Sequence, residues 1–197
     1  MSRLLCKLLL AALCCLPLAL NAQLAVGAKG GVNFAQQEVN SALLDQRITY
    51  NAGLAFNLYL AEFSFGGFAL QPEVLYSNKG SMQQVSDGVW TDKLSYVEVP
   101  VGLTYLLNFG SVVPYISVAP YYAFLVSQKS EIRGLEEAIN LYKNADYGIK
   151  IGGGLELQKF QISAAYSLGL CDISKSGAGV YSRGVEISLG YFFLNTY

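Results

Sequence analysis

Seven charged residues stand at regular positions within otherwise apolar stretches, and their types could support acid–base chemistry. They are three lysines and four glutamates: Lys29, Lys79, Lys150, Glu73, Glu98, Glu156 and Glu186. Two carboxylates held close together can act as general acid and general base, and Glu73 and Glu98 lie on neighbouring predicted strands. The same seven residues can instead pair as salt bridges, because an isolated ion is costly away from water. Which of these two roles applies depends on the secondary-structure elements that carry the seven residues.

Composition excludes most other kinds of catalytic and binding site. The chain contains no histidine, which removes the commonest metal ligand and the most frequent general base. Ser77 and Lys79 remain conceivable as a nucleophile and its base, but the sequence has no calcium-binding loop and no phosphate-binding loop. The formal net charge of −1 gives no basic surface for nucleic acid. We therefore predict no enzyme activity, no catalytic residue, no metal, no cofactor and no nucleic-acid partner.

Residues 1–22 predict a secretory signal peptide. A basic start is followed by an apolar stretch over residues 8–20 and by a small residue at the expected cleavage position. An uncleaved membrane anchor is the alternative, but the apolar stretch is shorter than the roughly 20 residues that a spanning helix needs, and Pro17 interrupts it. We expect one mature domain, residues 23–197, with Cys171 as its single cysteine and hence no internal disulfide.

The rest of the sequence alternates apolar and polar residues with period two, which is typical of strands with two different faces. Eight such stretches follow one another, at residues 24–34, 50–60, 68–76, 97–107, 112–126, 147–157, 160–170 and 185–193. One face of every stretch lacks charged and amide side chains and holds residues such as Leu54, Leu103 and Ile151. The opposite face holds the seven charged residues together with Asn, Gln, Ser, Thr and many glycines.

Two architectures produce this alternation, and the glycines distinguish them. In a water-soluble sandwich or lipocalin-like barrel the polar face meets solvent, whereas in an outer-membrane barrel it lines the interior and the apolar face meets lipid. A solvated face has no need of many glycines, but a narrow lumen must combine small and large residues to fill its interior. The pattern therefore predicts an all-β fold, namely an eight-stranded antiparallel transmembrane β-barrel.

The connections between the predicted strands alternate in length. Long connections at residues 36–47, 80–93, 129–145 and 172–183 alternate with short ones at 61–67, 108–111 and 158–159. Outer-membrane barrels have short periplasmic turns and longer external loops. The even number of strands then places both termini in the periplasm.

Inside such a barrel, a structural role for the seven charged residues is favoured over a catalytic one. The interior of an eight-stranded barrel is just wide enough for side chains to fill, so charges held there must pair. We expect a salt-bridge network that fills the lumen. A proton path or substrate site at Glu73 and Glu98 is the alternative.

Two of the long connections hold residues that suggest a role at the external mouth. Leu135, Ile139 and Tyr142 have helical spacing, which predicts a short amphipathic helix lying over the mouth. Trp90, the only tryptophan, lies in the second long connection, where it could anchor the chain at the membrane interface or contact a partner.

Several of these segments resemble a known family. Residues 70–80, 96–101, 114–122 and 148–156 are similar to strands three to six of the outer membrane protein β-barrel domain family, often labelled the PorT family. Ala119 stands where members commonly have glycine. The resemblance implies an eight-stranded barrel in the outer membrane of a Gram-negative bacterium, and it brings no catalytic residues. One branch of the family is associated with type IX secretion.

The last predicted strand resembles the C-terminal strands that the barrel-assembly machinery recognises. Its apolar residues alternate from Val185 to Phe193, and the chain ends on the aromatic Tyr197. Outer-membrane lipid and the assembly machinery are therefore expected partners, with a secretion component as a further possible protein partner. The favoured function is that of a structural or interaction protein acting through its external loops; the alternative is a narrow transport or secretion-accessory channel. An enzyme acting on lipids is the third hypothesis.

Overall fold

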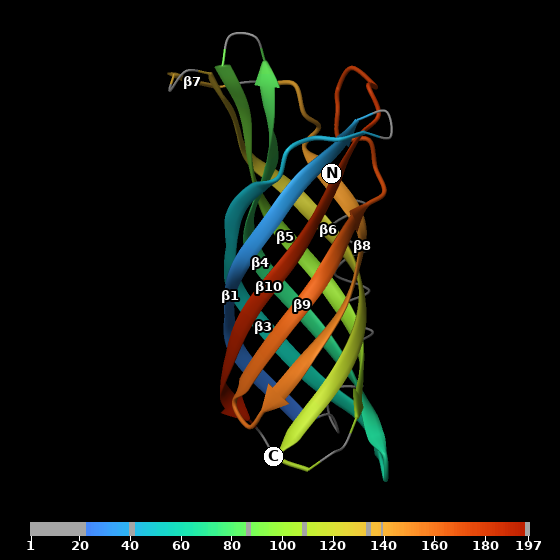
Figure 1. The fold of residues 1–197 in the computed structure, drawn as a ribbon. Coiled ribbons are helices and arrows are strands. Elements are labelled where there is room, and N and C mark those ends of the chain that lie inside the picture. Colours follow the sequence, from blue (N-terminus) through green and yellow to red (C-terminus); the bar gives the residue numbers. More distant parts are fainter. Residues whose placement is uncertain are drawn as a thin grey trace, which may run out of the picture.

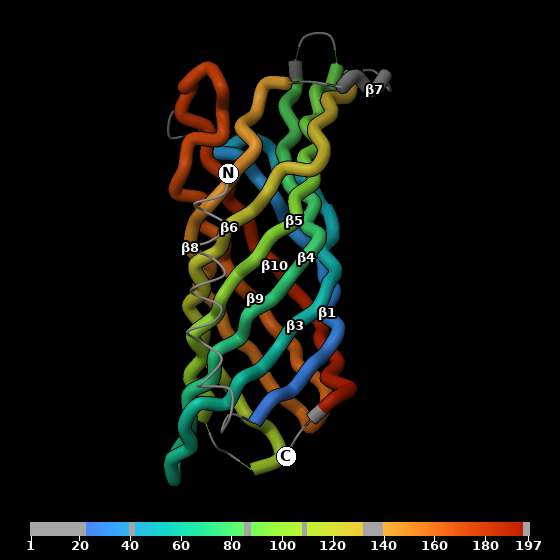
Figure 2. The backbone as a smooth tube through the Cα atoms, turned by 180° about the vertical axis from the view of Figure 1, so that it is seen from behind, coloured from blue at the N-terminus to red at the C-terminus, as the bar shows by residue number. Residues whose placement is uncertain are grey.

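The strands of the computed structural model form one antiparallel sheet that closes into a barrel (Figures 1 and 2). The structure describes residues 23–39, 42–85, 88–107, 110–132, 135–138 and 140–195. The predicted signal peptide and Tyr197 lie outside these described residues. Within them, no helix is long and apolar enough to span a membrane.

Eight long strands make the ring, and two short strands extend it. The long strands are β1 (Gln23–Val39), β3 (Arg47–Phe63), β4 (Gly66–Val85), β5 (Gly88–Leu107), β6 (Val112–Ile132), β8 (Ala145–Leu157), β9 (Phe160–Gly169) and β10 (Val180–Asn195). The short strands are β2 (Ala42–Leu43), which pairs with β1, and β7 (Leu135–Ala138), which pairs with β6. Neighbouring long strands pair in chain order, and β10 pairs with β1 to close the ring. We call the end with the three short connections the turn end and the opposite end the loop end.

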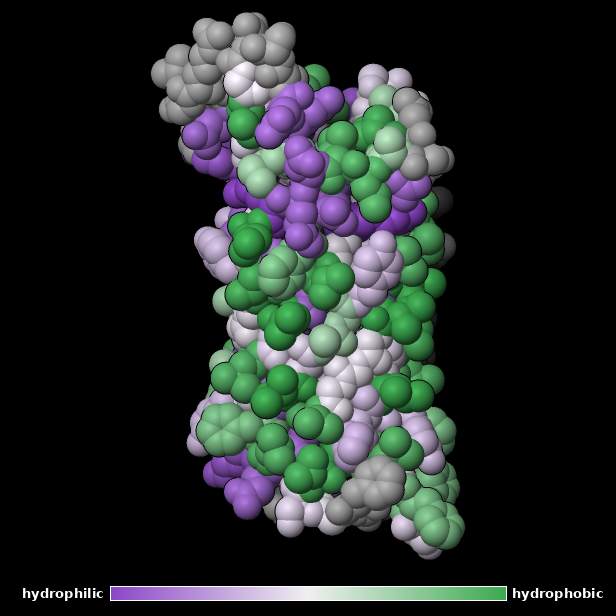
Figure 3. Space-filling model, viewed as in Figure 1, coloured by the Kyte–Doolittle hydropathy of each residue, from purple (hydrophilic) through white to green (hydrophobic). Residues whose placement is uncertain are grey.

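The two faces of the strands differ as the sequence predicts. Apolar side chains on the outer surface remain exposed, including Leu103 at 53%, Ile116 at 63% and Ile151 at 51%. They form a hydrophobic belt around the barrel, and a more hydrophilic zone lies between this belt and the loop end (Figure 3). Because apolar surface of this extent is unfavourable in water, the belt is suited to contact with lipid.

Aromatic pairs lie near both ends of the belt. Towards the turn end, the Phe68 ring lies 5.1 Å from that of Tyr105 and the Phe160 ring lies 5.1 Å from that of Tyr191. Towards the loop end, the Tyr122 and Phe124 rings are 4.7 Å apart. Two levels of aromatic residues are typical of the girdles at membrane interfaces.

Glycine allows the interior to accept large side chains. A Cβ atom placed on Gly154 would come within 2.8 Å of the Tyr115 hydroxyl, and Tyr115 itself is only 5% exposed. The small residue on β8 therefore makes room for the large one on β6, as expected for a filled, narrow barrel.

Two expectations for the loop end are wrong. The predicted connection at residues 80–93 consists largely of β4 and β5, which remain paired from Gly80–Lys93 to Val85–Gly88, so that Trp90 lies within β5. This hairpin projects at the loop end (Figure 1). The predicted helix is also wrong, because Leu135–Ala138 is strand β7, paired with the end of β6. The exposed edge of β6 offers backbone hydrogen bonds that a short isolated helix lacks.

Candidate functional site

The middle of the lumen contains a buried ion cluster drawn from four strands. Lys79 Nζ lies 2.6 Å from Glu98 Oε2 and 3.2 Å from Asp146 Oδ2. Lys150 Nζ contacts the other oxygen of Glu98 and lies 2.8 Å from Glu186 Oε1. The Glu98 and Asp146 side chains are wholly inaccessible to solvent. Two ammonium groups thus face three carboxylates, and Glu98 bridges both lysines.

A tyrosine completes this middle ion cluster. The Tyr121 ring, on β6, lies with its centroid 4.4 Å from Lys79 Nζ, and its hydroxyl donates to Asp146 Oδ2 at 3.3 Å. The ring face stabilises the ammonium through its quadrupole while the hydroxyl supports the carboxylate. The cluster therefore ties together β4, β5, β6, β8 and β10.

A second polar chain crosses the lumen nearer the turn end. Lys29 Nζ donates to Glu73 Oε1 at 2.7 Å, and the Gln71 amide donates to the same oxygen at 2.8 Å. Gln71 and Gln161 exchange hydrogen bonds of 3.0 and 3.2 Å. Gln161 in turn donates to Glu156 Oε1 at 3.1 Å. This turn-side chain therefore links β1, β4, β8 and β9.

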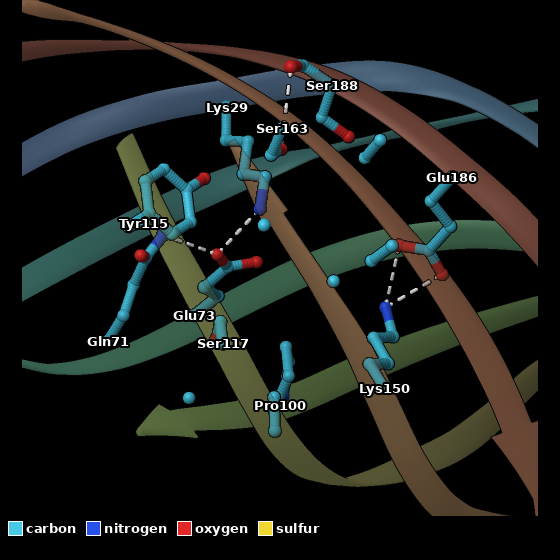
Figure 4. A pocket seen from close by; sticks show the side chains of 16 residues that line it. Lys29, Gln71, Glu73, Pro100, Tyr115, Ser117, Lys150, Ser163, Glu186 and Ser188 are labelled. Carbon is cyan, nitrogen blue, oxygen red and sulfur yellow. Dashed lines mark hydrogen bonds and ion pairs between the residues drawn. The ribbon is translucent and has the colours of Figure 1, made fainter. Parts of the chain in front are cut away.

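A cavity of about 50 Å³ lies between the two groups of charges. Lys29 and Glu73 line one part of it, and Lys150 and Glu186 line another (Figure 4). Its polar lining and size suit a few water molecules.

The loop end of the lumen is closed by side chains from two connections. Tyr142 and Ile173 are 7% and 0% exposed and pack with Leu94, Tyr96 and Tyr121. Their two connections pair through backbone hydrogen bonds, from Lys143 to Ile173 at 2.7 Å and from Lys175 to Leu141 at 2.9 Å. We call these paired connections, residues 140–144 and 170–179, the lid.

Asp92 holds the lid in place. The Tyr142 hydroxyl donates to Asp92 Oδ2 at 2.5 Å, while Ser130 Oγ and Trp90 Nε1 each donate to Oδ1 at 2.8 Å. Three donors on one buried carboxylate fix the tyrosine over the lumen. Trp90 therefore supports Asp92 in addition to any contact it makes at the surface.

The structure places all seven predicted charged residues in the interior, but it divides them. Glu98 belongs with Lys79 and Lys150, whereas Glu73 pairs with Lys29. Ser77 and Lys79, the conceivable nucleophile and base, have different partners. Ser77 Oγ accepts a hydrogen bond from Asn33, whereas Lys79 pairs with the carboxylates of Glu98 and Asp146. Among the described residues, no group of three potential metal ligands is close enough to hold an ion.

Sequence reasoning missed Asp146 and the Asp92–Tyr142 contact. Asp146 lies one residue before the predicted start of its strand, yet it shares the inward parity of Gly148 and Lys150, and extending the alternation would have found it. Asp92 and Tyr142 were assigned to loops, where parity gives no prediction.

A closed ring of eight antiparallel strands, with an apolar outer belt and an ionic interior, defines an integral β-barrel of the outer-membrane class. The chain belongs to the outer membrane protein beta-barrel domain family, whose model matches residues 20–175. The search of curated proteins finds no match.

Several solved outer-membrane barrels are similar to this chain at low sequence identity. Neisserial surface protein A (NspA) is 12% identical with a TM-score of 0.52, and the match covers 86% of this chain and 97% of that one. Ail, the attachment invasion locus protein of Yersinia pestis, is 15% identical with a TM-score of 0.46, covering 86% and 98%. The outer membrane enzyme PagL is 14% identical with a TM-score of 0.45, covering 82% and 98%. The closed ring of eight strands confirms the predicted fold class, and membership of the outer membrane protein family supports the predicted outer-membrane location.

Proposed function

We propose that this protein is a non-conducting outer-membrane barrel that acts as a structural or interaction protein through its loop end. The observation that carries the proposal is the closure of the lumen. Tyr142 and Ile173 lie buried over it, and the middle ion cluster fills it below. With the interior occupied by paired side chains, the surface of the lid and of the β4–β5 hairpin is the part available to a partner.

The lengths of the connections support an orientation for the barrel. Because the connections from β3 to β4, from β5 to β6 and from β8 to β9 are short, we propose that the turn end is periplasmic, together with the start of β1 and the end of β10. The lid then faces the exterior. Cleavage of residues 1–22 as a signal peptide and recognition of β10 by the assembly machinery belong to the same proposal.

We also propose a structural rather than catalytic role for the charged residues. A general acid or base must reach its substrate, whereas Glu98 is enclosed between two ammonium groups and Glu73 is held by Lys29 and Gln71. The Glu73→Gln variant should therefore leave the lipid composition of cells unchanged. A changed lipid profile would contradict this role.

Conductance in planar bilayers tests the closure. We expect folded protein to insert without current steps, because the lid and both ionic layers obstruct the lumen. Stable unitary conductance at modest voltage would overturn the proposal in favour of a narrow transport or secretion-accessory channel.

Partner capture tests the interaction. Leu43 and Leu141 are more than half exposed at the loop end, beyond the aromatic girdle. A protein that co-purifies from cross-linked native membranes should be lost with the Leu43→Glu/Leu141→Glu double variant but not with Leu60→Ala on the lipid face. Components of type IX secretion are the first candidates, because one branch of the family that this chain resembles is associated with that system. If no other protein co-purified with the barrel under any condition, the existence of a stable partner would be contradicted.

A further inference from the structure

The turn end of the barrel, in contrast to the loop end, opens into a vestibule of about 870 Å³. Its lining includes Glu62, near the end of β3, together with Ser111 and Lys159 from two of the short connections. Tyr59, Leu106 and Val113 provide apolar and aromatic walls. A concave site of this volume, lined by both apolar and polar side chains, has the general character of a small-molecule pocket.

One carboxylate, that of Glu156, lines this vestibule and has an unusual set of partners. Asn57 and Gln161 donate to its Oε1, and the Tyr59 hydroxyl donates to its Oε2, each at 3.1 Å. All three donors are neutral. Among the described residues, every other carboxylate of the two lumen networks has a lysine within 4.0 Å, whereas Glu156 has none.

The hydrogen bonds leave Glu156 suited to one more donor. A carboxylate offers about four acceptor positions, and three are occupied. A single compact donor can use the remaining position, whereas the planar fork of a guanidinium needs two. A divalent metal ion is better held by several carboxylates, and the described residues contain no group of three Asp, Glu, His or Cys side chains that could hold one. An ammonium group fits both the charge and the geometry.

We propose that the vestibule binds a primary ammonium group carried on a short apolar stem, with Glu156 as its anion. The ammonium supplies the positive charge that this carboxylate lacks. The stem packs against Leu106, Val113 and the Tyr59 ring, which line the vestibule. Asn57, Gln161 and Tyr59 position the carboxylate without neutralising it. The site lies at the opposite end from the lid and does not depend on the function proposed above.

Isothermal titration of the folded barrel in detergent micelles tests the site with three molecules of similar shape. Phenethylamine should bind, whereas 2-phenylethanol and 3-phenylpropanoate should bind at least about tenfold more weakly, since only the amine brings a positive charge to the carboxylate. Phenethylguanidine should also bind more weakly than the amine. Equal binding of the amine and the alcohol by the unmodified protein would overturn the proposal without any variant.

Variants assign the site to its residue. Glu156→Gln should lower the affinity for phenethylamine by about ten- to hundredfold, the range expected for a hydrogen bond to a charged group. Glu131→Gln removes the same charge from the loop end, outside the vestibule, and should change affinity little. Unchanged affinity in Glu156→Gln, or equal loss in both glutamine variants, would refute the assignment.

A parallel titration identifies the source of the ammonium group. Nα-acetyl-lysine methylamide represents a lysine side chain of a polypeptide, and phenethylamine represents a free amine. Selective binding of either one, lost in Glu156→Gln, supports the site and names its source. Binding of neither would refute it.

Discussion

Glu98 illustrates how single side chains are constrained inside this barrel. It contacts both Lys79 and Lys150 and is wholly buried, so it joins the two halves of the middle ion cluster. The sequence was sufficient to place Glu98 and both lysines on the inward face, because the parity of a strand fixes the face of every second residue. It could not show which charges pair, since parity says nothing about distances across the lumen. Asp146 was missed only because its strand begins earlier than the apolar pattern indicates.

Removing a lysine from the middle ion cluster should lower the free energy of unfolding more than removing a carboxylate. Lys79→Met leaves three carboxylates with one ammonium, whereas Glu98→Gln leaves Lys79 with Asp146 and Lys150 with Glu186. We expect Lys79→Met to lower the free energy of unfolding by about 3–5 kcal/mol, as for other broken buried pairs, and Glu98→Gln to lower it less while still allowing insertion. Urea unfolding in micelles measures both values. If Glu98→Gln lowered the free energy of unfolding more than Lys79→Met, the assignment of two ammonium groups to three carboxylates in this cluster would be wrong.

A charged residue on the outer face should destabilise the barrel more, the deeper it lies in the bilayer. Leu103, on the lipid-facing side of β5, is 53% exposed to the surroundings of the barrel. We expect Leu103→Arg to cost about 2–4 kcal/mol, the range for arginine deep in the bilayer. Leu60→Arg, nearer the turn end, is the control and should cost less. Assembly of Leu103→Arg as efficient as that of the parent would mean that this face does not meet lipid.

At the scale of elements, the alternation located all eight long strands but not their full lengths. It detects a strand only where one face is apolar, which is the membrane-crossing part. Beyond that part, β4, β5 and β6 continue without an alternating apolar outer face, and their backbones remain paired. The spacing of Leu135 and Tyr142 predicts a helix because a local pattern contains no information about the free edge of β6. Residues 135–138 pair with that edge as a strand. The lid is therefore visible only in the structure.

The lid should respond to acid through Asp172. Backbone N–H groups of Val180 and Ser174 donate to its carboxylate at 2.9 Å and hold the pKa of Asp172 below its usual value. The stabilisation is therefore present above the unfolded pKa of about 3.9 and is lost as the pH falls through the lower folded value. Hydrogen-exchange protection of the two amides should decrease in that acidic window.

Asp172→Asn should remove this pH dependence, and Asp45→Asn, another change of charge at the loop end, should retain it. Protection that does not change with pH in the unmodified protein would contradict the role of Asp172.

At the scale of the whole molecule, the barrel is asymmetric, with a lid at one end and an open vestibule at the other. Composition and alternation were sufficient to predict a closed membrane sheet, because lipid demands that every backbone group in the hydrocarbon be paired. They could not predict the asymmetry, which depends on how Tyr142 and Ile173 meet across the lumen from separate connections.

The central claim is that one parity of every strand faces lipid and the other faces a filled interior. Nitroxide labels placed singly at positions 99–106 of β5, in protein reconstituted into bilayers and lacking Cys171, test it most directly. We expect oxygen accessibility to alternate with period two, with maxima at positions 99, 101, 103 and 105, where the parent residues face outwards. Accessibility without alternation, or with maxima at positions 100, 102, 104 and 106, would contradict the claim.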